Sequence, residues 1–297
     1  MTSSSVSQTT QTTALKLVRR LLPPLKELPW AAIIILAWFL FVAVFANALT
    51  PYTPEQMTMS NRLHSPGFRA GANYYLLGTD NLGRDLFTRI LFGARISLIV
   101  AAFALLAGGG IGLTVGIVSG YIGGKLDAIL MRFTDCFLAL PPLLIALVFV
   151  MSLGPGLTTV IIALAIITWA RFARNIRAEV LTLKERDFVM QARVAGCSSI
   201  RIMVVHIFPN VLNTFMILAS INVSHNILTE ATLSFLGAGI PPPSPTWGNM
   251  VSDGTRYIAS AWWIGVFPGL ALTLVVFSLN QFTDWLRDKL DPKLRQM

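Results

Sequence analysis

Five long stretches without a charged side chain constrain this sequence more than any other feature. They cover residues 30–49, 96–124, 136–170, 202–229 and 257–283. A helix that crosses a bilayer needs about 20 mostly apolar residues. The third stretch is too long for one helix and contains the turn sequence Ser152-Leu153-Gly154-Pro155-Gly156, so it divides into helices at about 128–151 and 157–175. The pattern predicts an all-α integral membrane protein with six transmembrane helices.

Composition and charge agree with this architecture. Only 12% of the 297 residues are charged, against about a quarter in soluble domains, and 54% are hydrophobic. These values exclude a soluble globule, a disordered chain, a disulfide scaffold and a nucleic-acid binder. With a cytoplasmic N-terminus, 17 of the 23 Lys and Arg residues fall in cytoplasmic segments, as the positive-inside rule requires. We therefore expect both termini to be cytoplasmic.

The same pattern divides the chain into four parts. Residues 1–28 form a polar cytoplasmic leader, and residues 29–95 hold the first transmembrane helix and a long outside segment. Residues 96–290 form a five-helix core with a cytoplasmic loop at about 176–207, and 291–297 form a cytoplasmic tail. The first helix is expected to be retained, because its 20 apolar residues exceed the core of a signal peptide.

Glycine and proline mark special positions within the helices. Gly108, Gly112, Gly116 and Gly120 recur every four residues, a spacing that allows two membrane helices to approach closely. This interface is either static or rocks during a transport cycle. Pro141-Pro142 kinks the predicted third helix. The kink either lines a cavity, as in many transporters, or is a plain bend.

The two outside segments carry their own signals. Thr79 or Asp80 is a suitable cap for a short amphipathic helix after the first membrane span. In the second segment, Pro242, Pro243 and Trp247 lie in a proline-rich stretch that is expected to be stiff and extended. That stretch is either an outer lid or a rigid connector.

Charged residues flank the inner ends of the third and fourth helices. Arg171, Arg174 and Arg177 recur every three residues, and we expect them to reach toward lipid headgroups. Asp135 is expected to pair with Arg132, one helical turn away.

Polar residues interrupt the fifth helix. Asn222, Asn226 and Glu230 are spaced by four and share one face, with His225 beside it. An ionisable group at membrane depth costs about 2.5–3.5 kcal/mol, so this face contacts protein or water. Three interpretations remain open: a translocation path, a hydrogen-bonded brace between helices, and a proton relay through His225 and Glu230.

The cytoplasmic loop is the most informative segment. Residues 183–196 read as a short amphipathic helix that ends at Gly196, and Ser198 can cap a second helix through Val205. His206 and Pro209 then begin the fifth membrane helix. Two short cytoplasmic helices joined by glycine could dock in a groove of a soluble partner, or form a solvated re-entry loop.

The sequence contains no recognisable catalytic set. A phosphate-binding loop of the form GxxxxGK[ST] is absent, and neither HExxH nor GxSxG occurs. The three histidines lack metal-ligand spacing, so no metal site and no cofactor of its own are expected. If ATP energises transport, another chain must hydrolyse it.

Several motifs resemble the permease subunits of bacterial ABC importers. The segment Phe188–Gly196, with Pro209 thirteen residues after Gly196, is similar to the cytoplasmic EAA loop of that family. Met190 stands where the family often has Glu, and Gln191 where it has Ala. The stretches 78–85, 131–135, 229–237 and 242–250 resemble the C-type subunit of peptide and nickel importers. Together the motifs cover about residues 30–290.

The resemblance implies a function as well as a type I importer permease fold. It implies a permease subunit in the bacterial inner membrane that pairs with a second, related permease chain. Two ATPase subunits, which bind ATP and Mg, would hold the cytoplasmic loops, and an extracytoplasmic binding protein would deliver peptides or a related small solute. The coupling residues would be Arg186, Met190, Gln191, Ala192, Arg193, Gly196, Ser198, His206 and Pro209. The alternative is a proton-coupled secondary transporter that uses Glu230 and His225.

Overall fold

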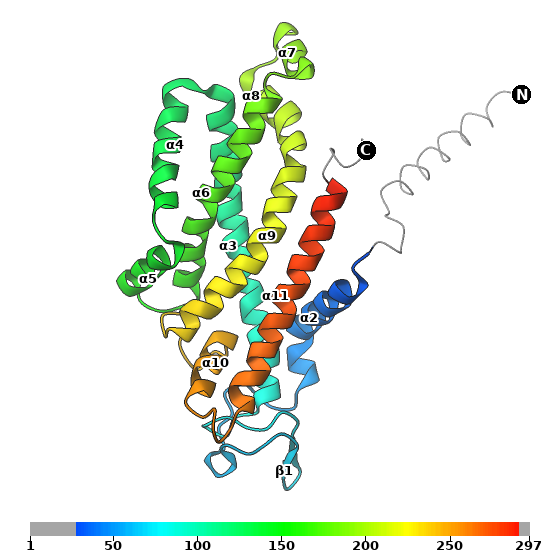
Figure 1. The fold of residues 1–297 in the computed structure, drawn as a ribbon, viewed down its shortest axis with the longest axis vertical. Coiled ribbons are helices and arrows are strands. Elements are labelled where there is room, and N and C mark those ends of the chain that lie inside the picture. The colour runs from blue at the N-terminus through cyan, green and yellow to red at the C-terminus, as the bar shows by residue number, and fades with distance from the viewer. Residues whose placement is uncertain (1–27, 291–297) are drawn as a thin grey trace, which may run out of the picture.

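A computed structural model describes residues 28–290, so the predicted leader and tail lie almost entirely outside the described residues. Its long helices are α2 (Trp30–Leu49), α3 (Leu86–Ile122), α6 (Leu157–Leu183), α9 (Phe208–Phe235) and α11 (Trp263–Leu290). The shorter elements are η2 (Met59–Asn61), β1 (Phe68–Ala70), β2 (Asn73–Tyr75), α4 (Gly124–Ala139), α5 (Pro142–Leu153), α7 (Asp187–Val194), α8 (Ser199–Arg201), the π-helix η3 (Ile202–Ile207) and α10 (Trp247–Thr255). The long helices run side by side, with α7 at one end of the molecule and β1 at the other (Figure 1).

The expected number of membrane crossings agrees with the structure, but the third crossing is not one helix. Within residues 28–290, five helices are long and apolar enough to span a bilayer, and the pair α4 and α5 makes a sixth candidate. These two helices meet at an angle of 90°, so the kink predicted at Pro141-Pro142 is a complete break and the single helix predicted at 128–151 is wrong. Leu140 is extended because a residue before proline avoids helical angles, and α5 restarts at Pro142.

The glycine stripe brings α3 and α6 into direct backbone contact. A Cβ atom placed on Gly112 would lie 2.4 Å from Phe172 Cβ and 2.4 Å from the Trp169 carbonyl oxygen. Gly108, Gly116 and Gly120 meet α6 in the same way. The predicted close approach is therefore confirmed, and its physical cause is that any side chain at these positions would occupy the space of the α6 backbone. Whether the two helices move against each other stays a prediction.

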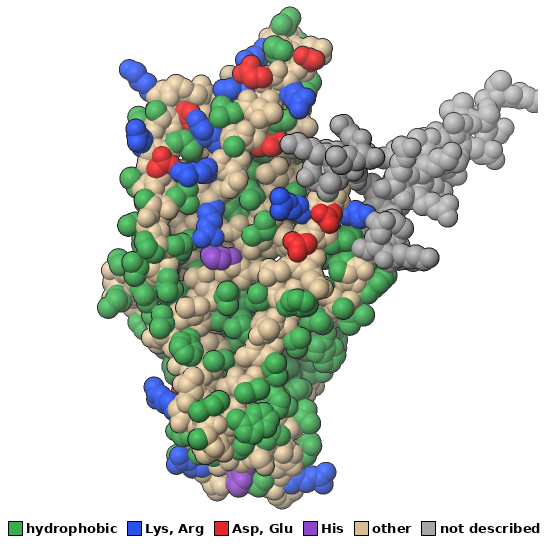
Figure 2. Space-filling view, viewed as in Figure 1, with side chains coloured by type: hydrophobic (Ala, Val, Ile, Leu, Met, Phe, Trp, Pro, Cys, Tyr) green, Lys and Arg blue, Asp and Glu red, His purple; other side chains and the backbone are tan. Residues whose placement is uncertain are grey.

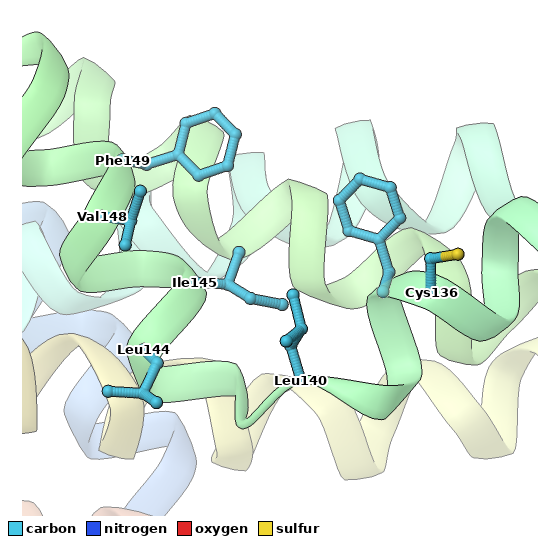
Figure 3. A pocket seen from close by; sticks show the side chains of 7 residues that line it. Cys136, Leu140, Leu144, Ile145, Val148 and Phe149 are labelled. Atoms are coloured by element: carbon cyan, nitrogen blue, oxygen red, sulfur yellow. The ribbon is translucent and has the colours of Figure 1, made fainter.

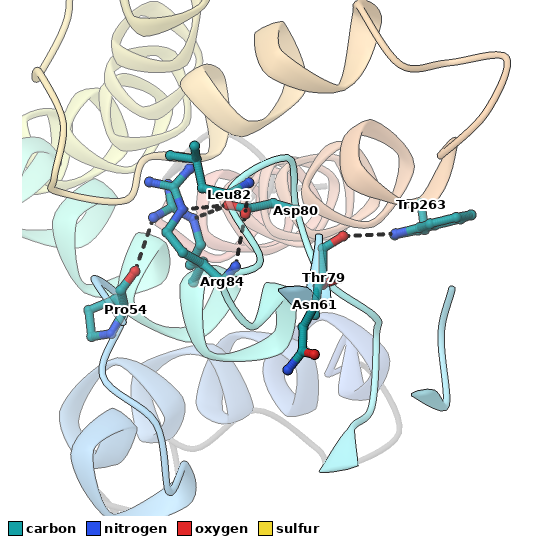
Figure 4. Close-up of polar contacts among 8 residues, drawn as sticks. Pro54, Asn61, Thr79, Asp80, Leu82, Arg84 and Trp263 are labelled. Carbon is teal, nitrogen blue, oxygen red and sulfur yellow. Dashed lines mark hydrogen bonds and ion pairs between the residues drawn. The ribbon is translucent and has the colours of Figure 1, made fainter. Parts of the chain in front are cut away.

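The segment between α2 and α3 folds over the β1 end around a buried ion cluster (Figure 4). Asp80 Oδ2 lies 2.6 Å from Arg84 Nε and 3.5 Å from Arg89 Nε, and all three side chains are about 95% buried. Asp80 Oδ1 accepts hydrogen bonds from the backbone N–H groups of Leu82 and Arg84, and Arg89 donates to the carbonyl oxygen of Pro54. Since Asp80, Arg84 and Arg89 all have partners, their burial is compensated, and these contacts hold the segment between α2 and α3 in place.

The helix cap predicted at Thr79 or Asp80 is wrong, because the cap of α3 is Asp85. Its Oδ2 atom accepts hydrogen bonds from the N–H of Thr88 at 2.8 Å and from the Thr88 hydroxyl at 2.6 Å. Thr79 instead forms an isolated antiparallel β-bridge with Asp85, and its carbonyl oxygen accepts a hydrogen bond from the Trp263 indole. Burial raises the pKa of the Asp85 carboxyl group, and the hydrogen bonds from Thr88 oppose this effect.

Candidate functional site

The cytoplasmic loop predicted from the sequence forms a projecting helix, α7, at one end of the molecule (Figure 1). Val189 and Ala192 are buried in an apolar cluster with side chains of α6 and η3. The opposite face of α7 carries Met190, which is 45% exposed, and the adjacent end carries Val194, which is 91% exposed. Two small buried side chains thus fix helix α7 to the rest of the protein, and its outer side presents apolar side chains.

Glycine ends this helix as the sequence predicts. Gly196 has a φ of +76°, a left-handed conformation that residues with a Cβ atom rarely adopt. Ser198 then caps the next helix, because its hydroxyl accepts a hydrogen bond from the N–H of Arg201 at 3.4 Å. Both predictions are confirmed.

The expected second short helix is not a separate element. Helix α8 continues through the π-helix η3 into α9, so residues 199–235 form one continuous helical segment. Pro209 therefore lies within this segment and not at its start. Proline has no N–H and its ring crowds the carbonyl four residues earlier, and the wider turns of η3 immediately before it provide the needed space.

The remaining loop residues are distributed around this projection. Arg186, Gln191, Arg193 and Pro209 are exposed, whereas His206 is half-buried in η3. The Arg193 guanidinium lies over the Tyr121 ring at 5.3 Å, which links α7 to the end of α3. The structure thus brings the predicted coupling residues together at one end of the molecule; their role stays a prediction.

Two of the three arginines of α6 bind carboxylates of α4, which the sequence did not predict; their contact with lipid headgroups stays a prediction. Arg177 makes a two-pronged contact with Asp127 through Nε and Nη2, each at 2.6 Å. Arg174 pairs with Asp135, which corrects the expected pair of Asp135 with Arg132. Asp127 also accepts a hydrogen bond from Ser119 of α3. These contacts tie α3, α4 and α6 together near α7.

The predicted path residues of α9 lie inside the subunit. Glu230 has no exposed surface; its carboxylate accepts hydrogen bonds from Ser234 at 2.8 Å and from Ser97 of α3 at 3.3 Å. Asn226 Oδ1 accepts a hydrogen bond from Thr168 of α6, and Asn222 donates to a carbonyl oxygen of its own helix. In this conformation the three side chains offer no surface to a solute. The geometry favours the brace among the three interpretations.

The proposed proton relay lacks a direct link. Glu230 is hydrogen-bonded to two serines, and no hydrogen bond joins it to His225 in the part of the chain that the structure describes. His225 is half-buried and lies on a different face of α9, because five residues separate it from Glu230. Arg171 was expected to reach toward lipid headgroups together with Arg174 and Arg177, and among the described residues it forms no ion pair with a carboxylate. The sequence carried one sign of this difference, because α6 has three arginines at this end whereas α4 has only two acids that can pair with them.

The outer stretch contains a short helix that was not expected. Pro242 and Pro243 are exposed, as an outer lid or connector requires, but Trp247 begins α10 and is only 1% exposed. Its ring lies 5.3 Å from that of Phe39, and its indole donates a hydrogen bond to the carbonyl oxygen of Ile90 at 3.0 Å. Trp247 therefore anchors α10 against α2 and α3, and its assignment to an exposed lid is wrong.

An open apolar hollow of about 380 Å³ lies at the bend between α4 and α5 (Figure 3). Its lining is Cys136, Phe137, Leu140, Leu144, Ile145, Val148 and Phe149. These side chains offer one thiol and otherwise only hydrocarbon. Such a cavity suits an acyl chain or an apolar side chain and cannot satisfy the backbone of a peptide.

A bundle of six candidate spans with a projecting short helix defines a multi-pass helical membrane protein. Residues 112–296 match the family of binding-protein-dependent transport system inner membrane components. The chain belongs to this family, which confirms the resemblance found in the sequence and makes it a permease component of the bacterial inner membrane.

Relatives and a solved structure agree with this assignment. The chain is 40% identical over 269 residues to the dipeptide transport system permease protein DppC of Alkalihalophilus pseudofirmus, covering 91% of this chain and 87% of that protein. It is 41% identical over 258 residues to the protein of the same name from Escherichia coli K12, covering 86% of each. The inward-facing MetNI methionine ABC transporter shares the fold, with a TM-score of 0.54 at 16% identity over 69% of this chain and 95% of that one.

Proposed function

We propose that this chain is one of two permease subunits of an importer for short peptides. Relatives about 40% identical over most of the chain are named as dipeptide transport permeases, which supports the substrate class. The second permease chain would be a related protein, and the solute would pass between the two. The chain would carry no hydrolytic activity itself, since ATP and Mg would be held by partner ATPase subunits.

The observation that carries the proposal is the projecting helix α7. It is a short helix whose buried side is fixed to the ends of α6 and η3 while Phe188, Met190 and Val194 face outward. Exposed apolar side chains on a projecting element suit a groove on a soluble partner. The α7 end would therefore be cytoplasmic and bind an ATPase subunit, and the β1 end would face the binding protein outside.

Met190, which stands where the family often has Glu, is compatible with the proposed contact between α7 and an ATPase subunit. Met190 is 45% exposed and lies on the outward face of α7, so the position reaches the expected partner although it lacks the carboxylate common in the family. A flexible thioether can fill an irregular apolar groove. The contact would therefore depend on packing rather than on an ion pair.

The proposal is tested by exchanging an exposed residue of α7. Val194→Glu leaves the buried face of α7 intact but places a charge at its most exposed apolar position. We expect the ATPase subunits to co-purify less well and ATP-dependent uptake of a labelled dipeptide to fall at least about tenfold. Ile258→Glu, at an apolar position near the β1 end that is 57% exposed, should leave ATPase co-purification unchanged.

Two outcomes would contradict the proposal. Unchanged co-purification and uptake in the Val194→Glu variant would mean that α7 does not contact the ATPase. Wild-type uptake that follows an imposed proton gradient without any ATPase chain would favour the secondary transporter instead. In that case Glu230→Gln should abolish uptake, whereas the brace interpretation predicts that it keeps the proton-independent uptake.

A further inference from the structure

An acidic hollow lies where the end of α2 and the start of α3 meet the segment around β2. It is open, has a volume of about 330 Å³, and is lined among others by Leu49, Tyr52, Tyr74, Leu76, Asp85 and Phe87. Asp85 is the one charged residue of this lining. Three segments that are separate in the sequence thus place apolar and aromatic side chains around a carboxylate.

The Asp85 carboxylate is buried, but only one of its two oxygens is satisfied. Asp85 is 5% exposed, and its Oδ2 atom accepts two hydrogen bonds from Thr88. Its Oδ1 atom has no hydrogen-bond partner among the residues that the structure describes. The arginines nearest in sequence do not compensate it, because Arg84 and Arg89 both bind Asp80. A buried carboxylate with an unpaired oxygen is costly unless a donor or a cation completes it.

Aromatic rings line the hollow beside this carboxylate. Tyr52 and Tyr74 come from the segment before α3, and Phe87 comes from the first turn of α3. The Tyr52 hydroxyl donates to the Tyr74 carbonyl oxygen at 3.3 Å and accepts from the Tyr74 N–H at 3.0 Å, so it is already bound to the backbone. Aromatic faces attract cations, and a carboxylate among aromatic rings therefore suits an ammonium group.

The acidic hollow lies at the boundary of the apolar surface. Helix α2 is a candidate span that ends at Leu49, and Leu49, Tyr74 and Leu76 are exposed. On the face drawn in Figure 2, hydrophobic side chains extend over the middle of the molecule toward the β1 end, where Lys and Arg side chains appear. Tyrosine rings are enriched at this level of a membrane protein, where lipid headgroups lie. A headgroup can therefore reach the hollow from the adjacent lipid.

We propose that the acidic hollow binds a phospholipid whose headgroup carries a primary ammonium, as in phosphatidylethanolamine. The ammonium would donate to Asp85 Oδ1 and lie against the aromatic rings, after a small movement of the lining side chains that cover this oxygen. Arg69 is exposed and lies over the ring of Tyr74 at 5.2 Å, so a cation next to the hollow is available to the lipid phosphate.

Charge complementarity of both signs favours a zwitterionic lipid as the occupant. Arg69 forms no ion pair with a carboxylate within the described residues 28–290, so its guanidinium is free to bind a phosphate. A basic side chain of a protein partner would be attracted by Asp85 but repelled by Arg69. The lipid site is independent of the solute that the protein transports.

The test compares two lipids that differ only in the charge of the headgroup. The full-length chain is purified in detergent and titrated with dioleoyl phosphatidylethanolamine or with its N-acetyl derivative, and bound lipid is measured by native mass spectrometry. The N-acetyl lipid keeps the phosphate and both acyl chains but has no cation. Binding through the acyl chains is therefore the same for both, and the ratio of the two affinities reports the ammonium contact.

We expect the wild type to bind phosphatidylethanolamine about fivefold or more tightly than the N-acetyl lipid, because a charge-assisted hydrogen bond is formed. Asp85→Asn should remove most of this preference and still cap α3, since asparagine is an equally good cap. Phe87→Leu should lower the preference by a smaller factor through the lost aromatic face. The matched control is Glu55→Gln, an exposed acid outside the lining, which should keep the preference of the wild type.

Three outcomes would overturn the proposal. The first is equal binding of the two lipids by the wild type, and the second is an unchanged preference in Asp85→Asn. The third is equal lipid binding together with weaker cross-linking of an extracytoplasmic binding protein to Asp85→Asn, which would assign the hollow to a basic side chain of that protein. A Tm of Asp85→Asn within about 2 °C of the wild type shows that the variant is folded. Phe87→Leu supplies a second measurement that leaves the cap untouched.

Discussion

Replacing Asp80 by asparagine removes a negative charge that two buried arginines share. Asp80 lies 2.6 Å from Arg84 Nε and 3.5 Å from Arg89 Nε, with 4–5% of each side chain exposed. The amide is nearly isosteric and can still accept the hydrogen bonds from the N–H groups of Leu82 and Arg84. The change therefore isolates the loss of charge from loss of packing.

The expected cost follows from the burial of both cations. Removing one partner of a buried ion pair costs about 3–5 kcal/mol, because the remaining charge has neither water nor counter-ion. We take about 3 kcal/mol here, since Arg89 keeps its hydrogen bond to Pro54. At about 2–4 °C per kcal/mol for a protein of this size class, Tm should fall by about 6–12 °C.

The assay is thermal unfolding of the purified protein in detergent, followed by tryptophan fluorescence. Trp263 reports on this region, because its indole donates a hydrogen bond to Thr79 next to Asp80. The control is Glu55→Gln, an exposed acid in the same outer segment, whose Tm should stay within about 2 °C. A second change, Arg84→Met in the Asp80→Asn protein, should recover part of the loss by removing an unpaired cation. A Tm for Asp80→Asn within about 2 °C of wild type would refute the reasoning.

Three further changes test the packing of α3. Gly112→Ala should lower the yield of folded protein and its Tm by several degrees, whereas Gly110→Ala, whose Cβ meets open space, should not; equal effects would contradict the helix contact. Asp85→Ala should lower the free energy of unfolding by about 1 kcal/mol through the lost cap, while Asp85→Asn should lower it little because asparagine caps equally well. Chemical denaturation measures both values, and a larger loss for Asp85→Asn than for Asp85→Ala would contradict the assignment of the cap. Trp247→Ala should cost about 3–5 kcal/mol by emptying a buried site and freeing the Ile90 carbonyl, and a loss below 1 kcal/mol in the same series would show that α10 is not anchored there.

The helix interactions that depend on local spacing could be read from the sequence. The glycine stripe at 108–120, the glycine stop at Gly196 and the Ser198 cap all appear where their spacing or residue type places them. The prolines at 141 and 142 were recognised as a disturbance, but not as a 90° break, since the angle depends on how α5 packs on α6. The cap of α3 was misplaced by five or six residues, because several acids and threonines in that segment are equally suitable.

Contacts between distant segments were the part that sequence reasoning missed. Asp135 has Arg132 within one turn, yet it binds Arg174, which lies 39 residues away. Glu230 was a candidate for the path, but the α3–α9 packing encloses it beside Ser97. Trp247 was assigned to an exposed stretch, although Gly93 leaves the space in which its ring lies. In each case a partner far along the chain decided the side chain's environment.

The sequence by itself determined that this chain is a membrane protein with six candidate spans, and that one loop has the pattern of an importer permease. Runs of apolar residues and helix-capping spacings are local properties, so no partner is needed to recognise them. Only the tertiary structure decided which polar groups satisfy one another across helices. It enclosed Glu230 beside Ser97 and paired Asp135 with Arg174 rather than with Arg132. The physical reason is that the direction of a side chain in a bundle depends on the rotation and crossing of helices that are remote in sequence.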